Sequence, residues 1–551
     1  MRLKGAEVVM ECLLAEGVDT IFGYPGGAVI PLYDAYTKYS DRIMHILTSH
    51  EQGASHAADG YARSSGKVGV CIATSGPGAT NTVTGIATAY ADSVPVVVIT
   101  GQVASALLGR DSFQEVDITA LTMSITKHNY QVRSVDEIAE VMHDAFRVAN
   151  SGRKGPVLVD IPKDLMMTET EYSAVKLEES EKVTVQGDFE KLAEMIAASE
   201  RPVIYSGGGV VSSGASKELL SFAEKCDIPV ANSLMGLGGF PRNHRLSIGL
   251  MGMHGFKETN LAVTSADLII AVGSRFSDRV IGDPDAFGEK AKLMHLDIDG
   301  AEIGKNKAVD GYAVGDLKEV LLKLTDSAPK GNRQQWLDYI HTHRDEQEPF
   351  GGAWSAVGAL KLANSHLEDS VVVTDVGQHQ MWTAQHWMFK EPRHWLSSGG
   401  LGTMGYGLGA AIGAQVALPD KNVVLVTGDG SFRMNCNELG TVARFGLPVT
   451  ILLFNNSTLG MVRQWQGMFC DDNYSQTDLG DYVDFIKLAG AYGIEGKRVE
   501  GYEELDSALL WAKESRRTVV IECRFSKDQF VYPIVPAGKA ISEMILERSV
   551  F

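Results

Sequence analysis

Short runs of apolar residues, rich in valine and isoleucine, recur along the whole chain. Within each run the apolar residues are continuous, which is typical of strands that are buried on both faces, as in parallel sheets. Helix-like segments lie between most of the runs, so the pattern predicts an α/β fold made of doubly wound parallel sheets. The clearest runs lie at residues 68–73, 94–100, 157–161, 268–272, 371–374, 423–427, 449–454 and 519–522.

Two polar stretches divide the chain into three parts of similar size. Residues 168–187 are charged and weakly periodic, and residues 326–352 hold proline, glycine and many charges, so both are predicted to be linkers. At 551 residues the chain is too long for a single hydrophobic core. We therefore expect three α/β domains and a C-terminal tail, at residues 1–167, 188–326, 353–535 and 536–551.

A weak internal repeat relates the first part to the third. The two stretches align without gaps at an offset of 353 residues, which places Thr74 on Thr427. Each copy contains a strand, a glycine-rich turn, a helix and a strand, which favours duplication of a domain over chance similarity between two α/β units. The copies differ at the turn, because the second carries Asp429 where the first carries Gly76.

Composition and charge narrow the classes of function. The formal net charge of −19 at pH 7 argues against a nucleic-acid or anionic-membrane partner, since both require a basic surface. No apolar run reaches the roughly 18 residues that a membrane-spanning helix needs, and Glu7, Glu11 and Glu16 interrupt the apolar N-terminus, unlike a signal peptide. The six cysteines form no CxxC pair and are interpreted as reduced thiols, so we expect a cytoplasmic protein.

A Gly-Asp-Gly turn at residues 428–430 is the strongest chemical signal in the sequence. It follows the apolar run at 423–427 and precedes a helix, where glycines let a phosphate approach the backbone. The next run ends in Asn455 and Asn456, and adjacent parallel strands would bring Asp429 and Asn456 together at the carboxyl edge of the sheet. One carboxylate and one amide suit Mg²⁺, which takes further oxygens from phosphate and water. The alternative is that Asp429 caps a helix and the asparagines form a turn.

This pair of motifs resembles the signature of the thiamine diphosphate (ThDP) enzymes. Two further segments carry the same resemblance: SHEQGASHAADGYAR, which contains Glu51, and GGLGTMGYGLGAAIGA, which begins at residue 399. The resemblance implies ThDP and Mg²⁺ as cofactors, with the metal held by Asp429, Asn456 and the backbone carbonyl of Thr458. ThDP chemistry needs a proton shuttled to the aminopyrimidine ring, and Glu51 matches the family's glutamate that bonds the ring nitrogen. Taken alone, Glu51 is an ordinary solvated charge.

The resemblance also implies how the cofactor is shared between domains. The first part would bind the pyrimidine ring and the third part the diphosphate and the metal. Because the two halves can belong to different subunits, we expect a homodimer or tetramer with sites at the subunit interface. The segment that begins at residue 399 can also be interpreted as a site of close helix packing through small residues. This interpretation is compatible with contacts to ThDP. Further implied contacts with ThDP are Gly377, Gln378, His379, Gly402, Met404, Gly428, Gly430 and Ser431.

Five segments narrow the resemblance to the large catalytic subunit of biosynthetic acetohydroxyacid (acetolactate) synthases. They are GYPGGAVIPLYDA, SFQEVD, GPVLVDIPKD, FSDRV and GMVRQWQ, and the resemblance runs from residue 1 to about 545. This family decarboxylates pyruvate and joins the two-carbon product to a second pyruvate or to 2-ketobutyrate, on the route to branched-chain amino acids. The resemblance implies small-molecule 2-keto acids as substrates and a small regulatory subunit as partner.

Four residues match positions that handle the substrate in that family. Arg279 matches the residue that meets the acceptor's carboxylate, which a bidentate guanidinium would hold and orient. Trp465 matches the aromatic residue that favours the larger acceptor, and Gln114 and Lys163 match residues of the entrance and site. The alternatives are a surface salt bridge for Arg279 and core packing for Trp465.

The middle part resembles the family's FAD-binding domain, in which FAD performs no redox step. A glycine-rich turn after a strand is weak evidence alone, so the resemblance depends on all the matching residues of the middle part together. The sequence departs from the common pattern at Ser277, Gly409 and Lys539, which leaves acceptor preference and inhibitor response open. The implied FAD contacts are Arg153, Gly207, Gly208, Met253, His254, Gly273, Arg275, Val280, Asp297 and Asp316.

Two other classes of function compete with this interpretation. The first is a related ThDP enzyme, either a catabolic acetolactate synthase without FAD or a flavin-using pyruvate oxidase, and the SFQEVD and GMVRQWQ segments argue against both. The second is an inactive homologue that serves as a binding subunit. Glu51, Asp429 and Asn456 are all present, which argues against that class.

Overall fold

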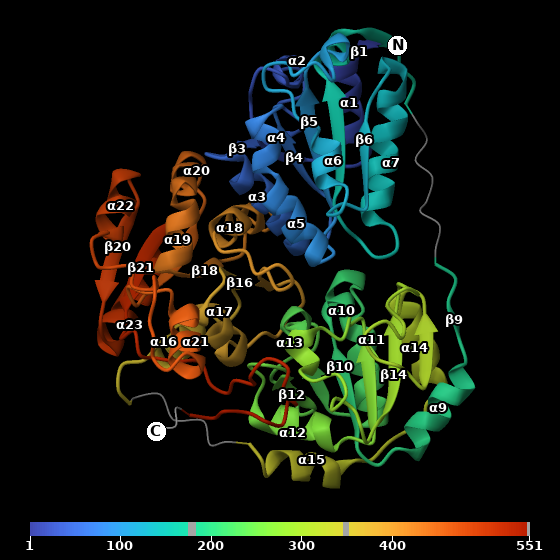
Figure 1. The fold of residues 1–551 in the computed structure, drawn as a ribbon, viewed down its shortest axis with the longest axis vertical. Helices are drawn as coiled ribbons and strands as arrows, with labels where there is room; N and C mark the ends of the chain where they lie inside the picture. Colours follow the sequence, from blue (N-terminus) through green and yellow to red (C-terminus); the bar gives the residue numbers. More distant parts are fainter. Residues whose placement is uncertain (175–182, 345–351, 548–551) are drawn as a thin grey trace.

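Three parallel sheets, one in each third of the chain, organise the structure (Figure 1). The computed structural model describes residues 1–174, 183–344 and 352–547. Every apolar run named above forms a strand of one of these sheets, so the fold class predicted from the sequence is confirmed. The parts of the predicted linkers at residues 175–182 and 345–351 lie outside the described residues.

The N-terminal sheet has six strands, all parallel. Across the sheet these are β3 (Met44–Leu47), β2 (Thr20–Tyr24), β4 (Gly69–Ala73), β5 (Val96–Gln102), β7 (Val157–Pro162) and β6 (His128–Gln131). Three helices pack on one face, namely α1 (Gly5–Ala15), α2 (Ile30–Tyr36) and α7 (Ile138–Asn150). The opposite face carries α3 (Glu51–Ser65), α5 (Val83–Ala91) and α6 (Ile118–Thr122).

The C-terminal sheet repeats this topology. Across the sheet its strands are β17 (Trp395–Leu396), β16 (Val371–Thr374), β18 (Val423–Gly428), β19 (Val449–Asn455), β21 (Val519–Arg524) and β20 (Glu495–Val499). When the strands of each domain are numbered in chain order, both sheets have the strand order 2-1-3-4-6-5. Strand β19 follows β5 in the chain by the same offset as the internal repeat. The shared strand order supports the duplication inferred from the sequence. The helices are α16 (Ala356–His366), α17 (Gln378–His386), α18 (Gly407–Ala417), α19 (Asp429–Asn435), α20 (Leu439–Phe445), α21 (Gly460–Phe469), α22 (Phe485–Ala491) and α23 (Tyr502–Ser515).

The central sheet has a different order, 3-2-1-4-5-6, which is that of dinucleotide-binding folds. Its parallel strands are β12 (Ser247–Leu250), β11 (Val230–Asn232), β10 (Pro202–Ser206), β13 (Leu268–Val272), β14 (Lys292–Asp297) and β15 (Gly311–Val314), and β9 (Gln186–Gly187) adds an antiparallel edge. The helices around it are α9 (Phe189–Ala198), α10 (Gly208–Ser213), α11 (Ser216–Cys226), α12 (Lys257–Ser265), α13 (Asp278–Ile281) and α14 (Leu317–Ser327).

One segment predicted as linker is folded. Residues 334–341 form α15, and its buried Trp336, Leu337 and Ile340 pack against the central sheet. The Trp336 indole also donates to the backbone oxygen of Pro202 at 3.0 Å. The linker prediction is wrong here because the many charges around this helix mask its short apolar face.

The C-terminal tail returns to the central domain. Ala540 forms a β-bridge with Gly282, and the Asp283 amide donates to the Lys539 carbonyl at 2.9 Å. Ile541 is buried in a core of the central domain. The tail predicted from residue 536 therefore packs on a domain that precedes it by some 250 residues in the chain.

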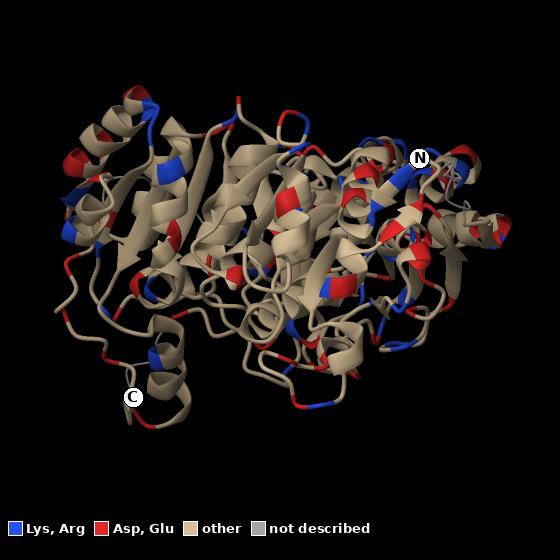
Figure 2. Cartoon of the chain, turned by 90° about the horizontal axis from the view of Figure 1, so that it is seen from above, with Lys and Arg blue, Asp and Glu red and all other residues tan. Residues whose placement is uncertain are grey.

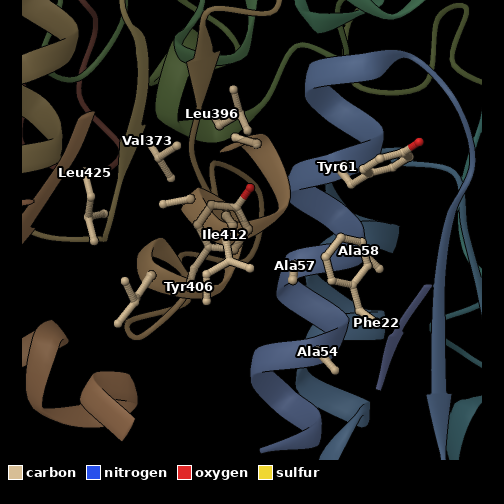
Figure 3. Packing of buried hydrophobic residues seen from close by; sticks show 14 of the residues in the cluster. Phe22, Ala54, Ala57, Ala58, Tyr61, Val373, Leu396, Tyr406, Ile412 and Leu425 are labelled. Atoms are coloured by element: carbon tan, nitrogen blue, oxygen red, sulfur yellow. The ribbon is translucent and has the colours of Figure 1, made fainter. Parts of the chain in front are cut away.

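The N-terminal and C-terminal domains meet through α3 and α18. Figure 3 shows Ala57 of α3 on the side that faces Ile412 of α18, with Phe22 packing on the far side of α3. A Cβ on Gly413 would overlap the Ala57 carbonyl oxygen, and one on Gly60 would overlap that of Ala410. The two helix backbones are therefore in direct contact, which small residues alone allow.

Charged residues of both signs are interspersed over the view of Figure 2. All six cysteines are unpaired in the structure. Within residues 1–174, 183–344 and 352–547, no helix combines the length and apolarity needed to cross a lipid bilayer.

Replacing Gly413 by alanine should lower the free energy of unfolding, because the added Cβ would collide with the backbone of α3. Overpacking of this kind costs about 1–3 kcal/mol, which denaturant titration would detect. Gly490→Ala in α22 is the control, since a Cβ there has no neighbour within 4 Å and alanine favours a helix. Equal stability of the two variants would contradict the direct contact between α3 and α18.

Candidate active site

A cavity of about 1180 Å³ lies between the central and C-terminal domains, with a wall from residues 92–93 and 150–154 of the N-terminal domain. It gathers most of the residues that the sequence analysis singled out from all three domains. Three predicted site residues, Glu51, Gln114 and Lys163, do not line it. The predicted residues that do are Arg153, Gly207, Gly208, Met253, His254, Gly273, Arg275, Arg279, Val280, Asp297, Asp316, Gly377, Gln378, His379, Gly402, Met404, Gly428, Asp429, Gly430, Ser431, Asn456, Thr458 and Trp465.

The Gly-Asp-Gly turn projects a buried carboxylate into this cavity. Strands β18 and β19 pair in register with Gly428 opposite Phe454, so Asp429 and Asn456 follow at the same sheet edge. Asp429 is 1% exposed, and burial raises its pKa to about 6. Among the described residues nothing hydrogen-bonds its Oδ2 atom, and a buried carboxylate in that state is costly without a cation.

The donor set fits Mg²⁺ bound together with a diphosphate. Within the described part of the chain, no group of three or more histidine, cysteine, aspartate or glutamate residues is arranged to hold a metal. Asp429 therefore offers a single carboxylate, and Asn456 adds an amide oxygen beside it. Mg²⁺ accepts such an incomplete protein shell because phosphate and water supply its remaining oxygens.

Hydrogen bonds fix the loop that follows β19. The Asn456 Oδ1 atom accepts from the Thr458 amide at 3.3 Å, and the Asn456 Nδ2 group donates to Gln378 Oε1 at 3.2 Å. Gln378 in turn donates to Gln464 Oε1 at 3.0 Å. The Thr458 hydroxyl donates to the Thr477 carbonyl at 2.7 Å. The asparagine and the loop are thus held by contacts among three separate segments.

A second turn, at residues 376–379, faces the Gly-Asp-Gly turn. Ser431 joins the two, since its hydroxyl donates to the Val376 carbonyl at 3.0 Å. His379 is buried, which lowers its pKa to about 3, so the imidazole is neutral, and nothing described bonds its Nε2 atom. A Cβ on Gly428 would lie 2.8 Å from the His379 ring. The two turns therefore leave a narrow polar space between them, which a side chain at Gly428 would fill. A space of this kind fits a diphosphate.

The central domain contributes glycine turns to the other end of the cavity, and the N-terminal domain contributes a cation. A Cβ on Gly207 would overlap the Gly273 carbonyl, and Gly273 itself has a φ of 58°, so both positions need glycine. Arg153 reaches this region from the N-terminal domain and donates to Ser93 Oγ at 2.9 Å and to Glu302 Oε1 at 2.8 Å. Together with the strand order of the central sheet, these turns fit an FAD molecule.

Arg279 and Trp465 come together from different domains. The Arg279 guanidinium carbon lies 5.9 Å from the centroid of the Trp465 ring, within the range of a cation–π contact. Arg279 also donates to the Met253 sulfur at 3.4 Å, while its side chain remains 59% exposed. The ion pair with Asp278, at 3.7 Å, is exposed and therefore weak. A cation and an aromatic face are thus presented side by side to the cavity.

Glu51, Gln114 and Lys163 lie elsewhere, at the carboxyl edge of the N-terminal sheet. Glu51 begins α3, and its Oε2 atom accepts from Asn81 Nδ2 at 3.0 Å. Gln114 has a φ of 59° and lies against Gly76, and Lys163 directly follows β7. The three residues therefore form a second polar edge that is separate from the cavity of the same chain.

The separation of Glu51 from Asp429 follows from α19. Asp429 is the first residue of α19, and Glu438 ends the short helix η4 (Cys436–Glu438) that continues it. Glu438 contacts the turn that precedes Glu51, as the Ser49 amide donates to it at 3.1 Å. Asp429 and Glu438 are thus the first and the last residue of α19 and η4, so the length of these two helices separates Asp429 from this contact.

Sequence reasoning missed a buried ion-pair network that holds part of the cavity wall. Arg63 pairs with Asp59 at 2.6 Å and with Asp92 at 2.9 Å, and both carboxylates are 0% exposed. Asp92 also accepts from the amides of Gly399 and Gly400, at 3.1 and 2.7 Å, in the loop that leads to Gly402. The i,i+4 spacing of Asp59 and Arg63 was the one available signal, and in a sequence it resembles an ordinary surface pair.

Three family models match the chain, one in each domain. Residues 3–121 match the N-terminal TPP binding domain of thiamine pyrophosphate enzymes, residues 189–324 their central domain, and residues 375–523 their C-terminal TPP binding domain. Thiamine pyrophosphate is another name for ThDP. The fold and the cavity are therefore those of a ThDP enzyme.

Similar proteins narrow this class. The probable acetolactate synthase large subunit of Methanocaldococcus jannaschii is 46% identical over 567 residues, covering 98% of this chain and 95% of that protein. The acetolactate synthase isozyme 2 large subunit of Escherichia coli strain K12 is 44% identical, covering 99% and 100%. The acetolactate synthase large subunit of Corynebacterium glutamicum is 45% identical, covering 98% and 90%. The chain belongs to the family of acetolactate synthase large subunits.

Substituting Asp92 by asparagine should destabilise the protein and weaken ThDP binding. The change leaves the buried Arg63 with one anionic partner and removes an anionic acceptor from the Gly399–Gly400 amides. Weakened hydrogen bonds to a buried charge cost about 1.5–3 kcal/mol, which denaturant titration and fluorescence-monitored ThDP binding would measure. Asp41→Asn, in an exposed pair with Arg42, is the control and should change neither quantity. Wild-type values for Asp92→Asn would show that this network does not support the loop.

Proposed function

We propose that this protein decarboxylates pyruvate and joins the two-carbon product to a second pyruvate or to 2-ketobutyrate, in branched-chain amino-acid biosynthesis. The products would be 2-acetolactate and 2-aceto-2-hydroxybutyrate. The observation that carries the proposal is the single cavity that holds both the Asp429–Asn456 turn and the Arg279–Trp465 pair. The relatives named above are all acetolactate synthases, so a pyruvate oxidase is not favoured.

The proposed cofactors are ThDP, Mg²⁺ and a non-redox FAD. Asp429, Asn456 and the Thr458 carbonyl would hold the metal, and the turns at 376–379 and 428–431 would hold the diphosphate. The glycine turns of the central domain and Arg153 would hold FAD. ThDP supplies the electron sink that decarboxylation of a 2-keto acid requires.

The protein's own residues would bind and orient the reactants. Arg279 would pair with the carboxylate of the acceptor, and the Trp465 face beside it would contact the acceptor's alkyl group. Glu51 would hold and move the proton at the pyrimidine ring nitrogen. The buried apolar walls of the cavity would keep bulk water from the reacting carbons.

We further propose that the enzyme is at least a homodimer with shared sites. Glu51, Gln114 and Lys163 are outside the cavity of their own chain, so a second copy would have to bring them to it. An exposed apolar side chain near this edge supports such an interface, since Phe113, next to Gln114, is 87% exposed. Because the relatives are named large subunits, we also propose a small regulatory subunit as partner.

Complementation between two inactive variants tests the reaction and the shared site together. Glu51→Gln should retain Mg²⁺ and ThDP but lose about 10²–10⁴-fold in turnover, and Asp429→Ala should lose metal binding. A hybrid dimer of the two has one site with both native residues and one with neither. Its acetolactate production should therefore reach up to about half the wild-type rate.

The control for complementation is co-expressed, differently tagged Glu51→Gln chains, which should stay inactive. Activity in the hybrid means that Glu51 and Asp429 act across subunits. Failure of the hybrid while wild-type enzyme makes acetolactate would place both residues in one chain's site. Wild-type enzyme that consumes pyruvate and yields acetate would overturn the proposed reaction.

Trp465→Leu should lower the preference for 2-ketobutyrate over pyruvate as acceptor. The substitution removes part of the apolar surface that would meet the extra methylene, which is worth about 1–3 kcal/mol. The product ratio in a direct competition between the two acceptors measures the change. Trp511→Leu, on α23 and away from the cavity, is the matched control. An unchanged ratio in Trp465→Leu would reject the role.

A further inference from the structure

The first turn of α3, which begins with Glu51, rests against the C-terminal domain of its own chain. The contact is made by η4, whose last residue, Glu438, is 0% exposed. Both carboxylate oxygens of Glu438 accept from the Ser49 amide, at 3.2 and 3.1 Å. The Ser49 hydroxyl also donates to the Asn437 carbonyl at 2.9 Å. The backbone just before Glu51 is thus fixed by a different domain.

The carboxylate of Glu438 is enclosed on its remaining sides. The Thr441 hydroxyl donates to it at 2.5 Å, and the backbone of His50 also hydrogen-bonds it. Burial raises the pKa of Glu438, while these donors oppose that rise. A Cβ on Gly53 would overlap this carboxylate, so glycine is required for the close approach to α3. A buried acid with this many donors has a defined position, which it imposes on the turn it holds.

The side chain of Glu51 depends on that turn. The hydrogen bond from Asn81 orients its Oε2 atom, but the direction in which the side chain leaves α3 is set by the backbone of residues 49–51. Errors of about 1 Å in the placement of an acid or base can reduce turnover by 10²-fold. A group that fixes this backbone therefore controls the reaction without touching the reactants.

We propose that Glu438 is a positioning residue for Glu51, an inference that rests on the proposed role of Glu51 in the ThDP reaction. Because α19 and η4 are consecutive, one continuous segment of the chain would hold the metal turn of one cavity and the acid/base residue of another. In a dimer with shared sites, the C-terminal domain of each chain would align the carboxylate that completes its partner's cavity.

Glu438→Ala and Glu438→Gln test this role in the full-length enzyme. We expect Glu438→Ala to lower kcat by about tenfold or more, with the KM for pyruvate and the affinity for ThDP changed less than about threefold. Glu438→Gln keeps one oxygen to accept the Ser49 amide, so it should recover part of the lost kcat. Tyr61→Phe, which removes a hydrogen bond to Asp19 from the other end of α3, is the control and should keep wild-type kcat.

Backbone amide exchange in the cofactor-free protein gives a readout that does not need the reaction. In Glu438→Ala the amides of Ser49 and His50 should exchange faster, while those of the C-terminal half of α3 stay as in wild type. Wild-type exchange at Ser49 and His50 would overturn the proposal, as would faster exchange with unchanged kcat. An equal loss of kcat in Tyr61→Phe would show general loosening of α3 and also overturn it. If wild-type protein makes no acetolactate, the proposed function fails, and exchange still tests the contact.

Discussion

The backbone contact between α3 and α18 is the constraint on which the arrangement of the whole chain depends. Gly60 and Gly413 remove the side chains that would hold the helices apart, so the N-terminal and C-terminal domains pack as one unit. This packing buries the Arg63 network and seats the start of α3 on Glu438. It also puts Glu51 outside the cavity that contains Asp429. The same contact therefore joins the two domains and keeps Glu51 apart from the cavity of its own chain.

The two domains joined in this way are copies of one another that have diverged. Their sheets have the same strand order, and the equivalent turns carry Gly76 in one and Asp429 in the other. A carboxylate at that turn suits a metal-bound diphosphate, whereas the glycine turn lies against Gln114 beside the residues around Glu51. Duplication thus supplies two similar sheet edges, and under the proposed function a few substitutions would give each one a separate half of the cofactor chemistry.

Burial is what makes the polar groups of this site informative. Asp429 and His379 both carry atoms without a described partner, and burial raises the pKa of the first and lowers that of the second. A buried polar atom without a hydrogen-bond partner costs free energy in a folded chain unless a bound ligand supplies that partner. Arg63, Asp92 and Glu438 are equally buried but fully engaged within the protein, so they support the site and need no ligand.

The sequence by itself determined the strands, the duplication and the chemistry of the Gly-Asp-Gly turn, because continuous apolar runs and residue type are local properties. Through the family motifs it also identified many of the residues that line the cavity, but not that Glu51, Gln114 and Lys163 lie outside it. It misassigned α15, whose apolar face is short, and gave no warning of the Arg63–Asp92 network or of Glu438. Those depend on pairs of residues far apart in the chain, such as Ser49 and Glu438, which only tertiary packing brings together. For the same reason, only the tertiary structure decided that Glu51 and Asp429 lie at opposite ends of α19 and η4.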